Sequence, residues 1–77
     1  MANVYALTEK GKGYFSKMRD NSSLFQTEGY LVLDDLFENG TDTTSEIARQ
    51  TGLSSGEVMR KIEEFKKQGL VETLADL

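Results

Sequence analysis

Two helix-start signals in close succession constrain the fold of this chain most strongly. Thr43 is followed three residues later by Glu46, and Ser54 is followed three residues later by Glu57. Each pair is a capping box, in which the hydroxyl accepts from one free backbone N–H group and the glutamate reaches back to another. Gly52 stands between the two boxes and can take the left-handed conformation that ends a helix. The sequence therefore predicts two short helices joined by a glycine turn, the pattern of a helix-turn-helix.

Apolar spacing places the end of the second helix. Val58, Ile62 and Phe65 recur at intervals of four and three residues, which aligns them as one buried stripe on a helix. Gly69 then ends this helix, and strand-like residues follow the break. The expected elements of this region are a helix over 44–51, a helix over 55–68 and a strand over 70–74.

The chain before this motif predicts one strand and two helices. A short strand-like run precedes Thr8, which is a helix cap, and helical apolar spacing follows in two segments. The expected elements are a strand over 3–7, a helix over 9–19 and a helix over 24–38. The predicted fold class is accordingly mainly α with a small β-sheet, in a single domain over 1–77.

Two residues of these helices allow alternative interpretations. Glycine weakens a helix by about 1 kcal/mol relative to alanine, so Gly11 marks either a frayed first turn or a close approach to a neighbouring element. Leu31 falls among the acids of a helix whose apolar face carries Leu33 and Leu36. It either covers an edge of the core or packs against a neighbour, such as the 9–19 helix or a second subunit. Asp35 is expected on the exposed face.

A longer residue pattern runs through the helix-turn-helix and the strand after it. Its residues are Glu46-Ile47-Ala48, Thr51-Gly52-Leu53-Ser54, Val58, Arg60, Ile62, Phe65 and Gly69-Leu70-Val71-Glu72. This pattern resembles the winged-helix regulators of the MarR-like and ArsR-like kind. The resemblance implies a winged helix-turn-helix fold, with 54–68 as the recognition helix and 70–74 as the first strand of the wing.

The order of the elements departs from that family. Its first wing strand is commonly followed by a loop, a returning strand and the start of a last helix. Here the sequence over 5–11 resembles that returning strand and helix start, but it stands near the beginning of the chain. Joining Leu77 to Met1 would restore the usual order, so we expect a circularly permuted wing in which strand 3–7 pairs antiparallel with strand 70–74. An ordinary N-terminal strand and helix is the alternative, and the pairing could form within one chain or between two.

Composition narrows the chemistry of the chain. It has no histidine and no cysteine, and so lacks the commonest catalytic base, thiolate metal ligands and disulfides. Asp34, Asp35 and Glu38 lie close in sequence, but acids on an exposed helix face are usually a solvated surface. We expect no enzyme activity, no cofactor and no metal. No apolar run reaches the roughly 18 residues of a membrane span, and a cytoplasmic setting fits a chain without cysteine.

The expected recognition helix presents polar side chains opposite its apolar stripe. Residues of its first turns reach base edges in this kind of motif, and an arginine there can make a bidentate contact to guanine. Basic and hydroxyl side chains nearby would contact phosphates. The candidate DNA-binding residues are Thr44, Arg49, Ser54, Ser55, Gly56, Arg60, Lys66 and Lys67. Ion pairs four residues apart would partly neutralise the basic groups: Glu57–Lys61, Arg60–Glu64 and Glu63–Lys67.

The formal net charge of −4 opposes the simplest nucleic-acid interpretation, since DNA-binding domains usually present an excess of Lys and Arg. Most of the acidity lies outside the recognition helix, however. Two function classes therefore remain. One is a sequence-specific transcriptional regulator that binds double-stranded DNA. The other is a winged-helix protein-interaction module that does not bind DNA, with a protein partner or a homodimer as its complex.

Overall fold

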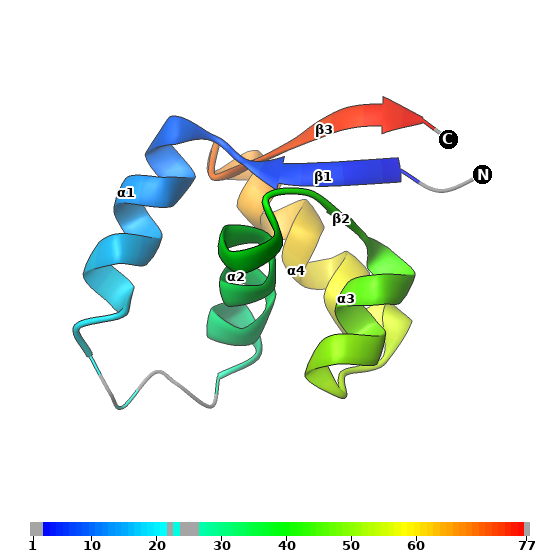
Figure 1. Ribbon diagram of the computed structural model, residues 1–77, viewed down its shortest axis with the longest axis horizontal. Helices are drawn as coiled ribbons and strands as arrows, with labels where there is room; N and C mark the ends of the chain where they lie inside the picture. The colour runs from blue at the N-terminus through cyan, green and yellow to red at the C-terminus, as the bar shows by residue number, and fades with distance from the viewer. Residues whose placement is uncertain (1–2, 22, 24–26, 77) are drawn as a thin grey trace.

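The computed structural model describes residues 3–21, 23 and 27–76. Helices dominate, and a small antiparallel sheet closes one side of the helical layer (Figure 1). The elements of the described residues, in chain order, are β1 (Asn3–Leu7), α1 (Glu9–Met18), α2 (Glu28–Asn39), β2 (Asp42–Thr43), α3 (Thr44–Thr51), α4 (Ser55–Lys67) and β3 (Val71–Asp76). This is the expected fold class, mainly α with a small sheet.

The N-terminal strand is the middle strand of the sheet, whose order is β2-β1-β3. β1 pairs antiparallel with both neighbours, with Tyr5 opposite Thr73 on one side and Asp42 on the other. The expected pairing of strand 3–7 with the C-terminal strand is therefore present within one chain. Asn3 lies opposite Asp76, so the first and last described residues meet at the same end of the sheet (Figure 1).

Several elements differ in length from the sequence prediction. The strand predicted over 70–74 spans Val71–Asp76, and the helices predicted over 9–19 and 55–68 each end one residue earlier. The helix predicted over 24–38 is observed as Glu28–Asn39, and positions 24–26 lie outside the described residues. The sequence does not predict β2, because two residues give no detectable alternation of polar and apolar side chains.

Helix caps form where hydroxyl residues precede the helices. Thr43 and Ser54 both accept from the backbone N–H group three residues on, at 3.3 and 3.1 Å. The Ser54 box is complete, because Glu57 also accepts from the Ser54 N–H at 3.0 Å. The Glu46 carboxylate instead accepts from Arg49. Gly52 ends α3 in the left-handed conformation at φ 81°, as the sequence predicted.

One apolar core joins all four helices to the sheet. The predicted stripe on α4 is confirmed, with Val58 and Ile62 fully enclosed and Phe65 almost so. Phe15 of α1 lies at the centre, with ring centroids 5.2 Å from Tyr30 and 5.1 Å from Phe37. The other members of the core are Tyr5, Leu7, Val32, Leu33, Leu36, Ile47, Leu70 and Val71.

α2 corrects the expectation for Asp35 and shows Leu31 beside α3. Asp35 is only 6% exposed, whereas the helical wheel placed it toward solvent. α2 is the central helix, and it packs against α1, α3, α4 and β1, so more than one of its faces is covered. Leu31 is half-buried and lines a shallow hollow with Gln50 and Thr51 of α3 rather than lying under α1.

Gly11 lies where α1 passes close to the turn before β3. A Cβ atom at this position would stand 2.0 Å from the Leu70 carbonyl oxygen, which is far inside van der Waals contact. The close-approach interpretation of Gly11 is therefore the one the structure supports. Gly13, two residues on, has no atom of another element within 4 Å of the corresponding point.

These two glycines allow a matched test of the α1 contact. We expect Gly11→Ala to lower the free energy of unfolding by about 1–3 kcal/mol, because overpacking must displace backbone. Gly13→Ala should raise it by up to about 1 kcal/mol through helix propensity. Urea denaturation of both variants measures the difference. Equal stabilities would show that α1 does not pack on the Leu70 carbonyl.

Candidate nucleic-acid interface

α4 turns one face into the core and leaves the opposite face to solvent. Its buried stripe is Val58, Ile62 and Phe65, and Gly29 of α2 lets the Phe65 ring approach closely. The exposed residues of α4 are Ser55, Gly56, Met59, Arg60, Glu63, Glu64, Lys66 and Lys67. Because the apolar stripe fixes the rotation of the helix, this polar face has a defined orientation.

The N-terminal segment of the chain caps the C-terminal end of α4. Thr8 donates from its backbone N–H to the Leu70 carbonyl at 3.0 Å and from its hydroxyl to the Gly69 carbonyl at 2.6 Å. Lys10 donates from Nζ to the Gln68 carbonyl at 2.8 Å. These carbonyls belong to the C-cap of α4 and the turn after it, and the bonds satisfy backbone acceptors that would otherwise depend on water. The beginning of the chain thus fixes the end of α4.

Lys10 was missed by the sequence analysis. It comes from α1, yet its ammonium group lies at the C-terminal end of α4, where Lys66 and Lys67 occupy the last turn. The contact joins positions 58 residues apart, and no local pattern marks it. The basic end of α4 is therefore built from two parts of the chain.

The start of α4 is fixed by its capping box. A hydrogen bond with Glu28, followed by the bonds to Ser54, lowers the pKa of Glu57 to about 2. The same contact with Glu57 raises the pKa of Glu28. Glu57 therefore stays ionised at neutral pH, where a negative charge at a helix N-terminus is favourable. Ser54, Ser55 and Gly56 lie exposed around this first turn.

Arg60 contacts a different acid from the one predicted. Its Nη2 atom lies 3.4 Å from Glu28 Oε1 of α2, and the Arg60 side chain remains 61% exposed. The other ion pairs of α4 are Lys61–Glu64 at 3.4 Å and Lys66–Glu63 at 3.9 Å, each with three-residue spacing. The predicted four-residue pairs are not the ones formed. Exposed pairs of this kind contribute only about 0–1 kcal/mol, so they hold the basic groups weakly.

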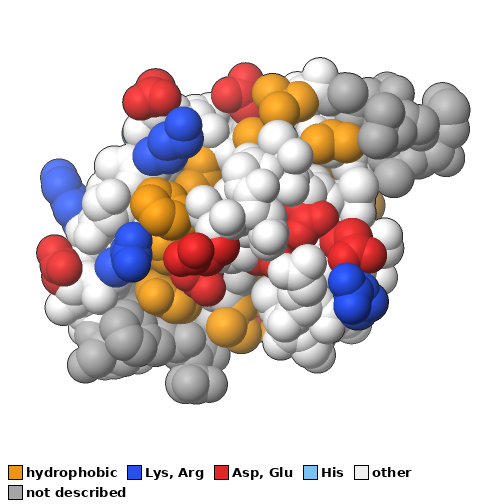
Figure 2. Space-filling view, viewed as in Figure 1, with side chains coloured by type: hydrophobic (Ala, Val, Ile, Leu, Met, Phe, Trp, Pro, Cys, Tyr) orange, Lys and Arg blue, Asp and Glu red, His pale blue; other side chains and the backbone are white. Residues whose placement is uncertain are grey.

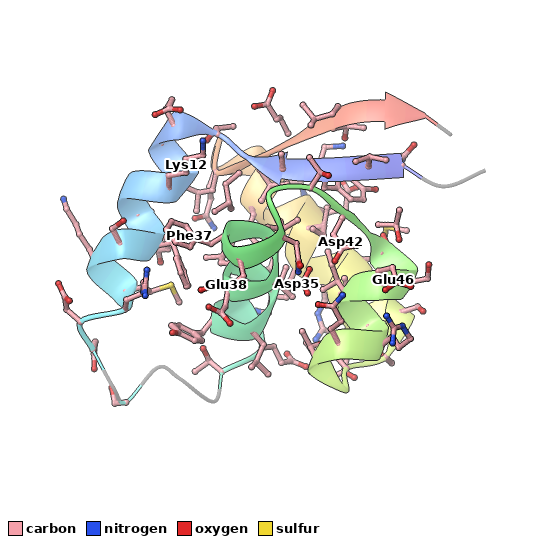
Figure 3. The ribbon with its side chains drawn as sticks, viewed as in Figure 1. Lys12, Asp35, Phe37, Glu38, Asp42 and Glu46 are labelled. Carbon is pink, nitrogen blue, oxygen red and sulfur yellow. The ribbon has the colours of Figure 1, made fainter. Side chains whose placement is uncertain are left out.

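The two candidates on α3 have different environments. Arg49 donates to both oxygens of Glu46, from Nη2 at 2.6 Å and from Nε at 3.3 Å, so its guanidinium is already engaged. Figure 3 shows Glu46 on the outer side of α3. Thr44 is the first residue of α3 and is half-buried. Both residues therefore lie on the helix before the turn and not on the exposed first turn of α4.

Acidic side chains gather on another face. Figure 2 shows the face that carries α2, with several acidic side chains near its centre. Asp34 and Glu38 of α2 line the hollow beside α3, and burial followed by the charge of Glu38 raises the pKa of Asp34. Within the described part of the chain, no group of three or more acidic side chains is arranged to hold a metal ion.

The family model for winged helix-turn-helix DNA-binding domains matches residues 30–72, which is more than half of the chain. The chain therefore belongs to the winged helix-turn-helix DNA-binding family. No curated protein and no solved structure matches this chain. Among the described residues, the helices are all too short or too polar to cross a membrane.

Neighbouring serines provide a test of how the first turn of α4 is held. We expect Ser54→Ala to lower the free energy of unfolding by about 0.5–2 kcal/mol, because it removes the cap that accepts from Glu57. Ser55→Ala should change it by less than about 0.5 kcal/mol, since Ser55 is an exposed surface position. Thermal or urea denaturation measures both. A neutral Ser54→Ala variant would contradict the capping role.

Proposed function

We propose that this chain is a sequence-specific DNA-binding transcriptional regulator, with α4 as the helix that enters the major groove. The observation that carries the proposal is the family match together with an α4 whose polar face is exposed to solvent. A helix of this kind reads bases with its N-terminal turns while flanking groups contact the backbone. The fold alone does not decide function, so the proposal depends on the residues of this face.

Arg60 is the proposed base-reading residue. It points from the exposed face of α4, one to two turns after the helix start, and its partner in the free protein is Glu28 at 3.4 Å. An exposed ion pair contributes about 0–1 kcal/mol, whereas a bidentate contact of arginine to guanine is worth about 1–3 kcal/mol of discrimination. DNA would therefore displace Glu28 from Arg60. Ser55 and Gly56 would lie against the neighbouring bases.

The proposed phosphate contacts come from both ends of the motif. Lys66 and Lys67 lie in the last turn of α4, and Thr44 and Arg49 lie on α3. Lys66 and Arg49 would exchange intramolecular partners, Glu63 and Glu46, for phosphate oxygens. Ser54 would contribute its exposed hydroxyl at the helix start. Because such contacts are ionic, affinity should depend strongly on salt.

A protein-interaction module without DNA binding is the second candidate. Its support is the net charge of −4 and the acidic side chains on the α2 face. Three large apolar side chains, Tyr14, Met59 and Leu74, are also about half exposed. The acidic α2 face would suit a basic protein partner, and the exposed apolar side chains, which lie on α1, α4 and β3, would suit a protein partner or a second copy of the chain.

We also infer that the domain is a circularly permuted winged helix of the MarR-like and ArsR-like kind. The family model ends at residue 72, inside β3, and so leaves β1 and α1 outside the match. β1 nevertheless pairs with β3 in antiparallel fashion and leads directly into α1. In a permuted winged helix, β1 would correspond to the returning wing strand and α1 to the last helix. The chain ends then correspond to an opened wing tip.

One arginine variant and one lysine variant test which residues of α4 read bases and which contact phosphates. A preferred site would first be selected from a randomised duplex pool, and affinities would then be measured by fluorescence anisotropy over a range of salt. Arg60→Ala should weaken the preferred site by about 1–3 kcal/mol and random duplex much less. Lys67→Ala should weaken both alike and reduce the salt slope by about one.

Lys17→Ala is the matched control, since Lys17 is an exposed cation in the last turn of α1. It should leave the affinity unchanged. If Arg60→Ala lowered binding to preferred and random duplexes equally, Arg60 would be a phosphate contact and not a base-reading residue.

A further inference from the structure

Two carboxyl groups from different elements meet inside the fold. Asp35 of α2 is buried, and Asp42 of β2 is half-buried. Each has one oxygen that accepts an ordinary hydrogen bond: Asp35 Oδ1 from Asn39 Nδ2 at 3.1 Å, and Asp42 Oδ1 from the Thr43 N–H at 2.9 Å. The two Oδ2 atoms are fully enclosed, and the described residues offer neither of them a conventional donor. Figure 3 shows both side chains in the space between α2 and β2.

Two ionised carboxylates cannot share such a place at low cost. Like charges in close contact repel strongly where water is excluded, and a buried acceptor without a donor loses the hydrogen bond it would make in water. A single proton removes both problems, because it turns one Oδ2 into a donor for the other. The charge of Asp34, another carboxylate, also raises the pKa of Asp35.

We propose that Asp35 and Asp42 share one proton and act as a pH-sensitive clamp between α2 and the start of the helix-turn-helix. Asp42 immediately precedes Thr43, which caps α3. Asn39 joins the same network, since it also donates to Gln50 Oε1 of α3 at 3.1 Å. Both ends of α3 are thus tied to α2 through residues that surround the carboxyl pair.

The charged groups around the pair do not replace the proton. On α2, Asp34 and Glu38 are acids, and the basic group at the end of α1 is Arg19, which acts on Asp34. On β1, Tyr5 lies opposite Asp42, and its hydroxyl accepts from Asn3. On α3, Glu46 is an acid, and the guanidinium of Arg49 is held by its carboxylate at 2.6 Å. Arg49 lies near enough for Asp42 to raise its pKa, but Glu46 is the main cause. The environment of the pair is therefore predominantly negative.

Burial, followed by the hydrogen bond and charge of Asp42, raises the pKa of Asp35 from 3.8 to about 7. Between these two values the folded protein keeps a proton that the unfolded chain has lost. Stability therefore falls as the pH rises through this window, and the fall is complete above about 7. Below about 4 both states are protonated, and the pair does not oppose folding. The clamp is closed in mild acid and weakened in mild base.

The clamp has a consequence for DNA that rests on the proposed function. α3 and α4 are joined by the Gly52 turn. Loosening α3 from α2 would therefore also shift α4, the helix proposed to enter the major groove. We expect the DNA affinity of the wild type to fall as the pair ionises, and to fall more than the DNA affinity of Asp35→Asn does over the same pH range.

Urea denaturation across about pH 4–8 tests the clamp without DNA. The variants are Asp35→Asn and Asp42→Asn, in which an amide supplies a permanent donor, and Glu38→Gln as an exposed control on the same helix. Relative to Asp35→Asn, the unfolding equilibrium constant of the wild-type protein should rise about tenfold or more between pH 4 and 8. Asp42→Asn should show a smaller rise than the wild type, because the charge of Asp42 is gone while Asp35 stays buried, and Glu38→Gln should follow the wild type.

Carbon-13 NMR of the carboxyl groups provides the direct readout. A shared proton predicts that the Asp35 signal titrates near neutral pH and that Asp42→Asn moves this titration to lower pH. If Asp35 titrated near its ordinary value, or if the wild type and Asp35→Asn had the same pH dependence, the proposal would be wrong. Stabilisation of the wild type, but not of Asp35→Asn, by millimolar Mg²⁺ or Ca²⁺ at pH 8 would also overturn it, since the pair would then hold a cation.

The two proposals fail separately. Loss of the pH step in both readouts would remove the clamp and leave DNA binding untouched. A pH step present in a protein that binds no duplex at any pH would keep the clamp and remove the proposed function.

Discussion

The structure depends on one corner, where the beginning of the chain meets the end of α4. Thr8 and Lys10 donate to three successive carbonyls, those of Gln68, Gly69 and Leu70. Gly11 lets α1 lie directly against the last of them. β1, which immediately precedes Thr8, is the central strand between β2 and β3. The orientation of α4 and of the sheet is therefore set by contacts between sequence-distant segments.

Charge is distributed unevenly over this frame. Acidic side chains gather on the face of α2, whereas the end of α4 carries Lys10, Lys66 and Lys67. The ion pairs that restrain the basic groups of α4 are exposed and weak, so a polyanion can replace them at small cost. A net charge of −4 is thus compatible with DNA binding through one helix, although it reduces long-range attraction.

Local signals predicted the local structure well. The hydroxyl caps at Thr43 and Ser54 and the stripe of Val58, Ile62 and Phe65 depend on neighbours within one turn, and all are present. A resemblance in residue order, rather than any local propensity, predicted that β1 would pair with β3. The helix-turn-helix pattern alone does not predict where the first part of the chain lies in the fold.

The errors concern residues whose environment is made by other elements. Asp35 lies on the polar side of its own helix, but α3 and β2 cover that side, so a wheel drawn for one helix misplaces it. Arg60 pairs with Glu28 of α2, and Lys10 of α1 reaches the C-terminal end of α4, because long side chains can contact elements that are distant in sequence. The candidate DNA-binding residues are all located by the structure, and contact with DNA stays a prediction.

The central claim, that the exposed face of α4 receives DNA, is tested most directly by mapping amide chemical shifts during titration with mixed-sequence duplex at low salt. The account predicts perturbations that concentrate on 54–60 and on the last turn of α4, that diminish as salt is raised, and that leave the acidic face of α2 unchanged. An unperturbed α4, or perturbations confined to the α2 face, would contradict it.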